Sequence, residues 1–97
     1  MRHFHRTTLR PDAVLGSADE YFESLGLKRN AGDARTRQFA GPLGVMRVTV
    51  RMEGGHYTLV EAFTDQVGES RLDKNVKNFF ANLHRTAEPR HRIEAGY

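Results

Sequence analysis

The sequence predicts a small α+β domain, an antiparallel four-stranded sheet with two helices on one face. Three observations predict this class. Residues 45–52 and 56–63 alternate between apolar and polar side chains, the period of a half-buried strand, and residues 2–9 do so more weakly. Apolar residues recur at helical spacing over 14–25 and 72–83. A chain of 97 residues suffices for one domain of two layers. The predicted order is strand, helix, three strands, helix.

The first helix has predicted boundaries at both ends. Ser17 and Glu20 have the spacing of a capping box, in which the hydroxyl and the carboxylate satisfy free backbone amides, so the helix is predicted to begin there. Residues 11–15 are interpreted as a separate turn, because Gly16 would weaken a continuous helix by about 1 kcal/mol. Gly26 is expected to end the helix in a left-handed conformation.

The middle of the chain predicts a loop followed by three strands. Polar residues 27–34 are expected to form the loop, residues 34–40 the next strand and residues 41–44 a turn. Gly54 and Gly55 predict a two-residue hairpin turn, because both accept positive φ. The side chains expected to face the helices are Met46, Val48, Val50, Tyr57, Leu59 and Phe63. Those expected on the opposite face are Arg47, Arg51, His56, Thr58 and Val60.

The charged segment from 65 to 74 is interpreted as the entry to the second helix. Ser70 and Asp73 have capping-box spacing. Asp65 and Glu69 precede the helix, where negative charge offsets the positive end of its dipole by about 0.3 to 1 kcal/mol. A structural role thus accounts for these acids, and no catalytic pair is needed to explain them.

Composition limits the functions to consider. We expect a single domain with an ordered core at about 2–85 and a loose tail at 86–97. There is no cysteine, which removes disulfides and thiolate metal sites and fits a cytoplasmic protein. No segment has the roughly 20 apolar residues that span a bilayer, so no membrane partner is expected. A core this thin leaves little room for an enclosed pocket.

Positive charge is concentrated in the middle strands. The formal net charge is +3, yet Arg35, Arg37, Arg47 and Arg51 lie in a stretch without an acid. The planar guanidinium group suits phosphates and carboxylates. This face therefore predicts an anionic partner.

The order of elements also resembles that of a known family. "EYFESLGL" after a first strand, the hairpin "GGHYT" and the terminal "LDKNVKNFFANL" together are similar to a shortened START-like, polyketide-cyclase domain of helix-grip fold. That resemblance implies a sheet that clasps the last helix around a cavity for an apolar ligand. It implies no specific functional residue, because it depends on the pattern of elements.

Several side chains are candidates for chemistry, each with a simpler alternative. His3 and His5 share one face of a strand and would form a metal site if His56 approached, but solvent-facing histidines are the favoured interpretation. Glu61 is either a general acid with a raised pKa or, as we favour, the partner of an arginine such as Arg47. Tyr57 and His56 are either a donor and base or ordinary hairpin residues. We predict no catalytic residue, metal or cofactor, and enzyme activity is not favoured.

The predicted function is a non-catalytic binding or protein-interaction module of START-like type, for a small apolar or anionic ligand. The alternative is a domain that binds nucleic acid or an acidic protein through an arginine-rich sheet face. Nucleic acid is disfavoured because this face lacks a predicted pair of stacking aromatics. A homodimer through the uncovered face is the third hypothesis. The candidate binding residues are Arg35, Arg37, Arg47, Arg51, His56, Tyr57 and Glu61.

Overall fold

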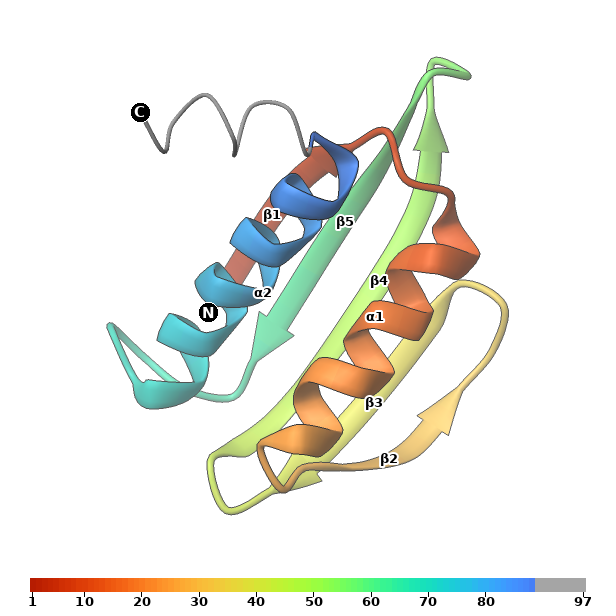
Figure 1. Ribbon diagram of the computed structural model, residues 1–97. Coiled ribbons are helices and arrows are strands. Elements are labelled where there is room, and N and C mark those ends of the chain that lie inside the picture. The colour runs from red at the N-terminus through yellow and green to blue at the C-terminus, as the bar shows by residue number, and fades with distance from the viewer. Residues whose placement is uncertain (89–97) are drawn as a thin grey trace.

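The computed structural model describes residues 1–88, which form five strands and two helices (Figure 1). The elements are β1 (Arg2–Thr7), α1 (Pro11–Ser24), β2 (Lys28–Gly32), β3 (Thr36–Gly41), β4 (Gly44–Glu53), β5 (Tyr57–Thr64) and α2 (Arg71–Ala87). The strands make one sheet in the order β1-β5-β4-β3-β2, and every neighbouring pair is antiparallel. The predicted α+β class is confirmed.

Both helices cover the same face of the sheet, as predicted. Helix α2 lies over β1 and β5, and α1 lies over β3 and β4 (Figure 1). Strands β2 to β5 form a meander, while β1 joins the sheet at the far edge beside β5. The connection through α1 therefore carries the chain from one edge of the sheet to the other. The opposite face carries no helix within residues 1–88.

The sheet has five strands because residues predicted as a loop form the edge strand β2. All five of its residues are exposed, and its register with β3 shifts between Arg29 and Ala31. A strand with no buried side chain has no reason to alternate, so β2 carries no strand pattern that could predict it. Charged residues and an irregular register also discourage pairing with another chain at this edge.

Helix α1 begins six residues earlier than predicted. Pro11 occupies its first turn, where a missing amide proton costs nothing, and Ser17 lies inside the helix. The predicted end is confirmed: Gly26 has a φ of 87°, and the amide of Leu27 donates to the Phe22 carbonyl at 3.1 Å. Burial of the first turn against the sheet outweighs the low helix propensity of Gly16, since Val14 and Leu15 are in the core.

The hairpin between β4 and β5 differs from the prediction by one residue, with a large effect. Gly54 and Gly55 have the expected positive φ, but His56 also belongs to the turn, and Glu53 pairs with Tyr57. A two-residue turn would have paired Glu53 with His56. One extra residue turns every β5 side chain to the other face of the sheet.

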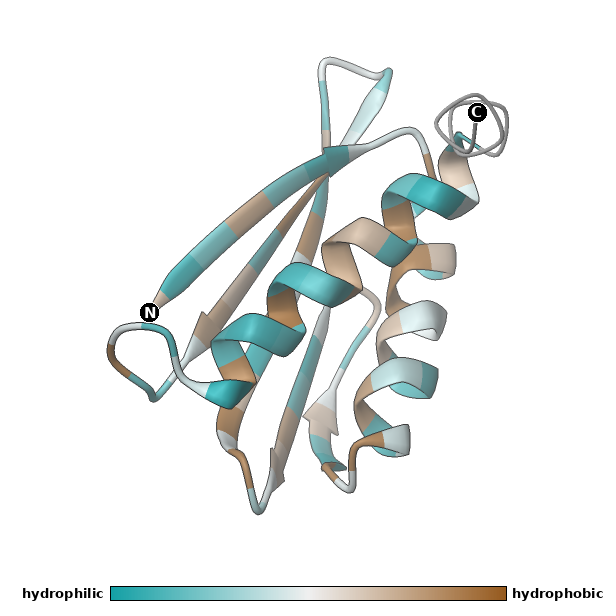
Figure 2. Ribbon diagram, turned by 60° about the vertical axis from the view of Figure 1, so that its left-hand side comes forward, coloured by the Kyte–Doolittle hydropathy of each residue, from teal (hydrophilic) through white to brown (hydrophobic). Residues whose placement is uncertain are grey.

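Three phenylalanine rings fill the space between the sheet and the helices. Phe22 of α1 lies 5.5 Å from Phe39 of β3 and 5.2 Å from Phe79 of α2, measured between ring centroids. All three are fully buried. Figure 2 shows the two helices packed on one side of the sheet with the other side bare. An apolar ligand between these layers would have to displace the rings.

Helix α2 begins as predicted at a capping serine. The Ser70 hydroxyl accepts a hydrogen bond from the Asp73 amide at 3.0 Å. The helix continues to Ala87, two residues past the predicted end of the core. The rest of the predicted tail, from residue 89 onward, lies outside the described residues.

Candidate functional site

The candidate site is the sheet face opposite the helices, which we call the open face. It contains the side chains that alternate with the core residues of β1, β4 and β5. These residues are Arg2, Phe4, Arg6, Val45, Arg47, Thr49, Arg51, Glu53, Tyr57, Leu59, Glu61 and Phe63.

The open face is organised in rows that run across the strands. In one row, Phe63 of β5 lies between Arg2 of β1 and Arg47 of β4. The Arg47 guanidinium lies over the Phe63 ring, 4.9 Å from its centroid, which is cation–π geometry.

A second row repeats this arrangement with an aliphatic centre. Leu59 lies between Arg6 and Arg51 by register. It is only 5% exposed although no helix within residues 1–88 covers this face. Arginine stems cover apolar surface while their charged ends stay in water, which accounts for this burial.

Between these rows lies Phe4, opposite Glu61. Its side chain is 59% exposed, and the guanidinium groups of Arg2 and Arg6 lie 5.9 and 6.0 Å from its ring centroid. Tyr57 is 51% exposed on the same face. Large exposed rings in a charged surface are typical of contact sites.

On β1, β4 and β5, the charge of the open face comes from four arginines and two glutamates. Arg2 pairs with Glu61 at 2.6 Å, and Arg6 pairs with Glu53. The hydrogen bond from Arg6 lowers the pKa of Glu53, so this carboxylate stays ionised at neutral pH. Neither Arg47 nor Arg51 forms an ion pair with residues 1–88, although the charge of Arg51 also helps to lower the pKa of Glu53.

The structure brings together four of the seven predicted site residues. Arg47, Arg51, Tyr57 and Glu61 share the open face. The interpretation of Glu61 as an ion-pair partner agrees with the structure, but the arginine is Arg2 of β1. Sequence alone does not show that β1 lies beside β5.

The other three predicted residues lie elsewhere. Arg37 faces the helices, where its Nε is 3.2 Å from an Asp19 carboxylate oxygen on α1. Arg35 precedes β3, and His56 lies in the hairpin turn. The predicted neighbours Thr58 and Val60 are buried under the helices, because of the longer turn.

The sequence prediction misses the aromatic part of this site. It places Phe63 in the core and does not single out Phe4. The signal that could have found them is parity: Phe4 alternates with two histidines, and Phe63 has the parity of the charged Glu61.

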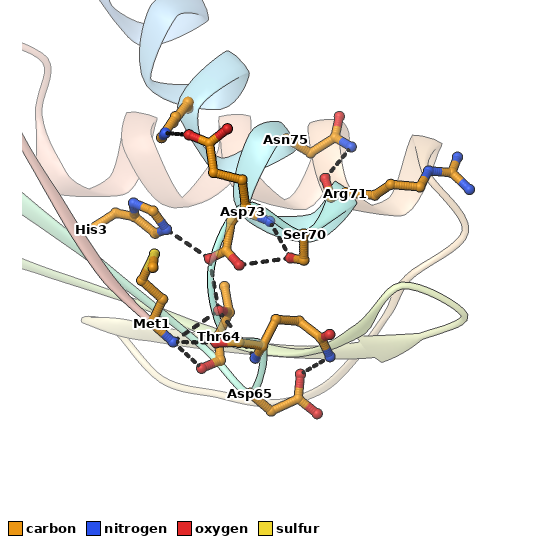
Figure 3. Close-up of polar contacts among 11 residues, drawn as sticks. Met1, His3, Thr64, Asp65, Ser70, Arg71, Asp73 and Asn75 are labelled. Carbon is orange, nitrogen blue, oxygen red and sulfur yellow. Dashed lines mark hydrogen bonds and ion pairs between the residues drawn. The ribbon is translucent and has the colours of Figure 1, made fainter.

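A second polar cluster joins β1, β5 and α2 around the buried Asp73 (Figure 3). The Asp73 carboxylate accepts hydrogen bonds from Ser70 and His3 at 2.7 Å each and from Thr64 at 2.8 Å. Asp73 is 1% exposed. The N-terminal amine of Met1 donates to the carbonyl and hydroxyl oxygens of Thr64 (Figure 3).

The physical state of Asp73 points to a structural role. Burial opposes its ionisation, but hydrogen bonds from Ser70, His3 and Thr64 outweigh burial and hold its pKa below the ordinary value. An ionised Asp73 can only accept, so the His3 Nε2 donates. An Asp–His pair also occurs in catalytic sites, yet here the bonds from His3 and Thr64 tie α2 to β1 and β5, and the bond from Ser70 closes the start of α2.

No metal site forms from the predicted histidines. His5 stacks on Phe80 with 5.3 Å between ring centroids, and His3 contacts Asp73. Residues 1–88 contain no group of three potential metal ligands. A groove of about 530 Å³ lies between α1 and α2 and is lined by Glu20, Tyr21 and Arg85 among others.

Comparison with known proteins adds no family. No protein-family model matches the chain, and no curated protein matches its sequence.

Neither of the two helices in residues 1–88 is long and apolar enough to cross a membrane.

Proposed function

We propose that this chain is a non-catalytic binding module whose open face takes an anionic partner. One observation carries the proposal: Arg47 and Arg51 have no ion pair with residues 1–88 and lie on a sheet face that also exposes Phe4 and Tyr57. A solubilising surface would not need these rings beside the guanidinium groups.

The packing of the molecule favours an anionic partner over an apolar ligand. Phe22, Phe39 and Phe79 occupy the space where a helix-grip domain would hold an apolar molecule. We keep the START-like resemblance as part of the proposal, on the sequence pattern that suggested it. A cytoplasmic location is proposed with it, on the cysteine-free composition.

Binding of labelled inorganic polyphosphate tests this function. Fluorescence anisotropy compares the wild-type chain with the double variant Arg47→Glu/Arg51→Glu. We expect affinity to fall at least about tenfold, because two attractions become repulsions of about 0.7 kcal/mol or more each. The matched control is Arg71→Glu/Lys74→Glu, which changes the net charge equally on exposed positions of α2. Equal loss in both variants would show that overall charge, and not the open face, binds the anion.

A further inference from the structure

The aromatic side chains of the open face are a feature that anion binding alone does not use. Phe4 on β1 and Phe63 on β5 are diagonal neighbours, because Phe4 pairs with Glu61 and Arg2 pairs with Phe63. Side chains in this relation are about 7–8 Å apart, within reach of one extended ligand. Phe4 is the more exposed of the two rings.

Guanidinium groups surround both rings. Arg2 and Arg6 lie near the Phe4 ring, and Arg47 lies over the Phe63 ring. A ligand group that stacks on Phe4 therefore lies next to the guanidinium groups of Arg2 and Arg6. Flat rings next to cations suit a polymer in which flat groups alternate with negative charges.

Charge and the exposed rings distinguish such a polymer from the other possible partners of the open face. A second copy of the chain would bring together two faces that each carry four arginines and two glutamates, so a net positive charge would meet a net positive charge. An acidic peptide would satisfy the arginines but offers few flat groups for Phe4. Single-stranded nucleic acid offers a phosphate and a base in every unit, and its bases stack on aromatic side chains.

We propose that the open face binds single-stranded nucleic acid, with a base stacked on the exposed Phe4 and phosphates bound by Arg47 and Arg51. This inference rests on the proposed function and names its partner class. Stacking does not depend on base identity, so we expect little sequence preference. The objection that the face lacks stacking aromatics is removed by the register of β5.

The test compares ligands that share phosphates and differ in accessible bases. The probes are fluorescein-labelled single strands of mixed sequence, abasic strands of the same length, and the corresponding duplex. RNA and DNA single strands are both used, and the strand that binds with the higher affinity shows which nucleic acid the face prefers. We expect the full chain to bind a single strand at least about tenfold more tightly than the abasic strand, and more tightly than the duplex.

Variants assign this difference to the rings. Phe4→Ala is expected to remove most of the preference for bases, about a tenfold loss, while leaving affinity for the abasic strand unchanged. Phe4→Tyr keeps a ring and should retain the preference. Val67→Ala is the matched control, because Val67 is an exposed apolar residue in the loop before α2.

A loss of affinity can also result from misfolding, so one variant is designed to increase affinity. Glu61→Gln removes the negative charge beside Phe4 and releases Arg2, so single-strand affinity should rise about threefold. Circular dichroism confirms that each variant is folded.

The outcomes separate the two proposals. Equal binding of base-bearing and abasic strands would overturn stacking and leave the anionic partner in place. An acidic polypeptide that competes as well as a single strand of equal charge would also overturn the nucleic-acid assignment. Failure to bind any polyanion, polyphosphate included, would overturn both.

Discussion

Asp73 shows how much of one residue's role depends on partners far away in the sequence. Its spacing from Ser70 predicted the helix cap, which the structure confirms. Its bonds with His3 and Thr64 could not be predicted, because they depend on where β1 and β5 pass the start of α2. The same carboxylate therefore closes a helix and joins three elements.

Replacing Asp73 with alanine is expected to reduce the free energy of unfolding by about 3 kcal/mol. The change removes a buried acceptor and leaves donors of His3 and Thr64 without a partner, and such losses cost about 1–3 kcal/mol each before relaxation. Urea denaturation measures the change. Glu23→Ala, at an exposed position of α1, should stay within about 0.5 kcal/mol of the wild type. A loss as small at Asp73 would contradict its central role.

Asp73 also predicts how stability depends on acid. Its pKa is lower in the folded state than its ordinary value of 3.8, so below about pH 5 the unfolded chain binds more protons than the folded one. The stabilisation is complete above that range and is lost as pH falls through the folded pKa. Urea denaturation of the wild type and Asp73→Asn between about pH 6 and 3 should show a converging difference. A constant difference would contradict the lowered pKa.

His5 predicts a second pH dependence, at higher pH. Burial, and then the charge of His84, lower its pKa below 6.5, and its buried Nε2 has no hydrogen-bond partner among residues 1–88. As pH falls below about 6.5 the unfolded chain gains a proton that folded His5 resists, so stability falls. His5→Phe keeps a ring to stack on Phe80 and removes this term. Its advantage over the wild type should grow from pH 7.5 to about 5.5, measured by thermal denaturation, and a fixed offset would contradict the argument.

At the scale of elements, the sequence predicted types better than boundaries and registers. Both helices and the β4–β5 hairpin were found, because their apolar periodicity is strong. The prediction of which β5 side chains face the helices was wrong, because one residue, His56, joins the turn. Such a shift does not change the composition of either strand, yet it moves Phe63 from the predicted core to the candidate site.

A substitution at Gly16 tests whether this residue lies inside helix α1, as a helix that begins at Pro11 requires. Gly16 lies inside the helix, is exposed, and has no neighbouring atom within 4 Å of the point where an alanine Cβ would lie. Gly16→Ala should therefore raise the free energy of unfolding by about 0.5–1 kcal/mol, since alanine loses less backbone entropy in a helix. The urea midpoint should rise with an unchanged slope.

The matched control for this change is Gly54→Ala. Gly54 also has open space around it, but its φ is 63°, which strains any residue with a Cβ. We expect this variant to lose about 1 kcal/mol. Stabilisation at both positions would indicate an effect on the unfolded chain and not on helix α1.

For the whole molecule, the fold separates a closed side from an open one. The helices and three buried rings close one face of the sheet, and Arg2, Arg6, Arg47 and Arg51 lie on the other with Phe4 and Phe63. The arginine part of the site was predictable because Arg47 and Arg51 alternate with core residues within one strand. The aromatic part was not, because it depends on the pairing of β1 with β5 and on the length of one turn.

This distribution of charge predicts the behaviour of the chain in solution. Pairing two open faces would oppose two surfaces of net positive charge, each with four arginines and two glutamates, so we expect a single-chain mass by sedimentation velocity at about 0.05 M salt. At about 1 M salt the screening length falls to about 3 Å, the repulsion weakens, and the exposed Phe4 and Tyr57 can begin to associate. Binding of polyanions should change in the opposite direction and weaken as salt rises. A dimer at low salt that dissociates on adding salt would mean that the faces attract one another, and would favour the homodimer hypothesis over an anionic partner.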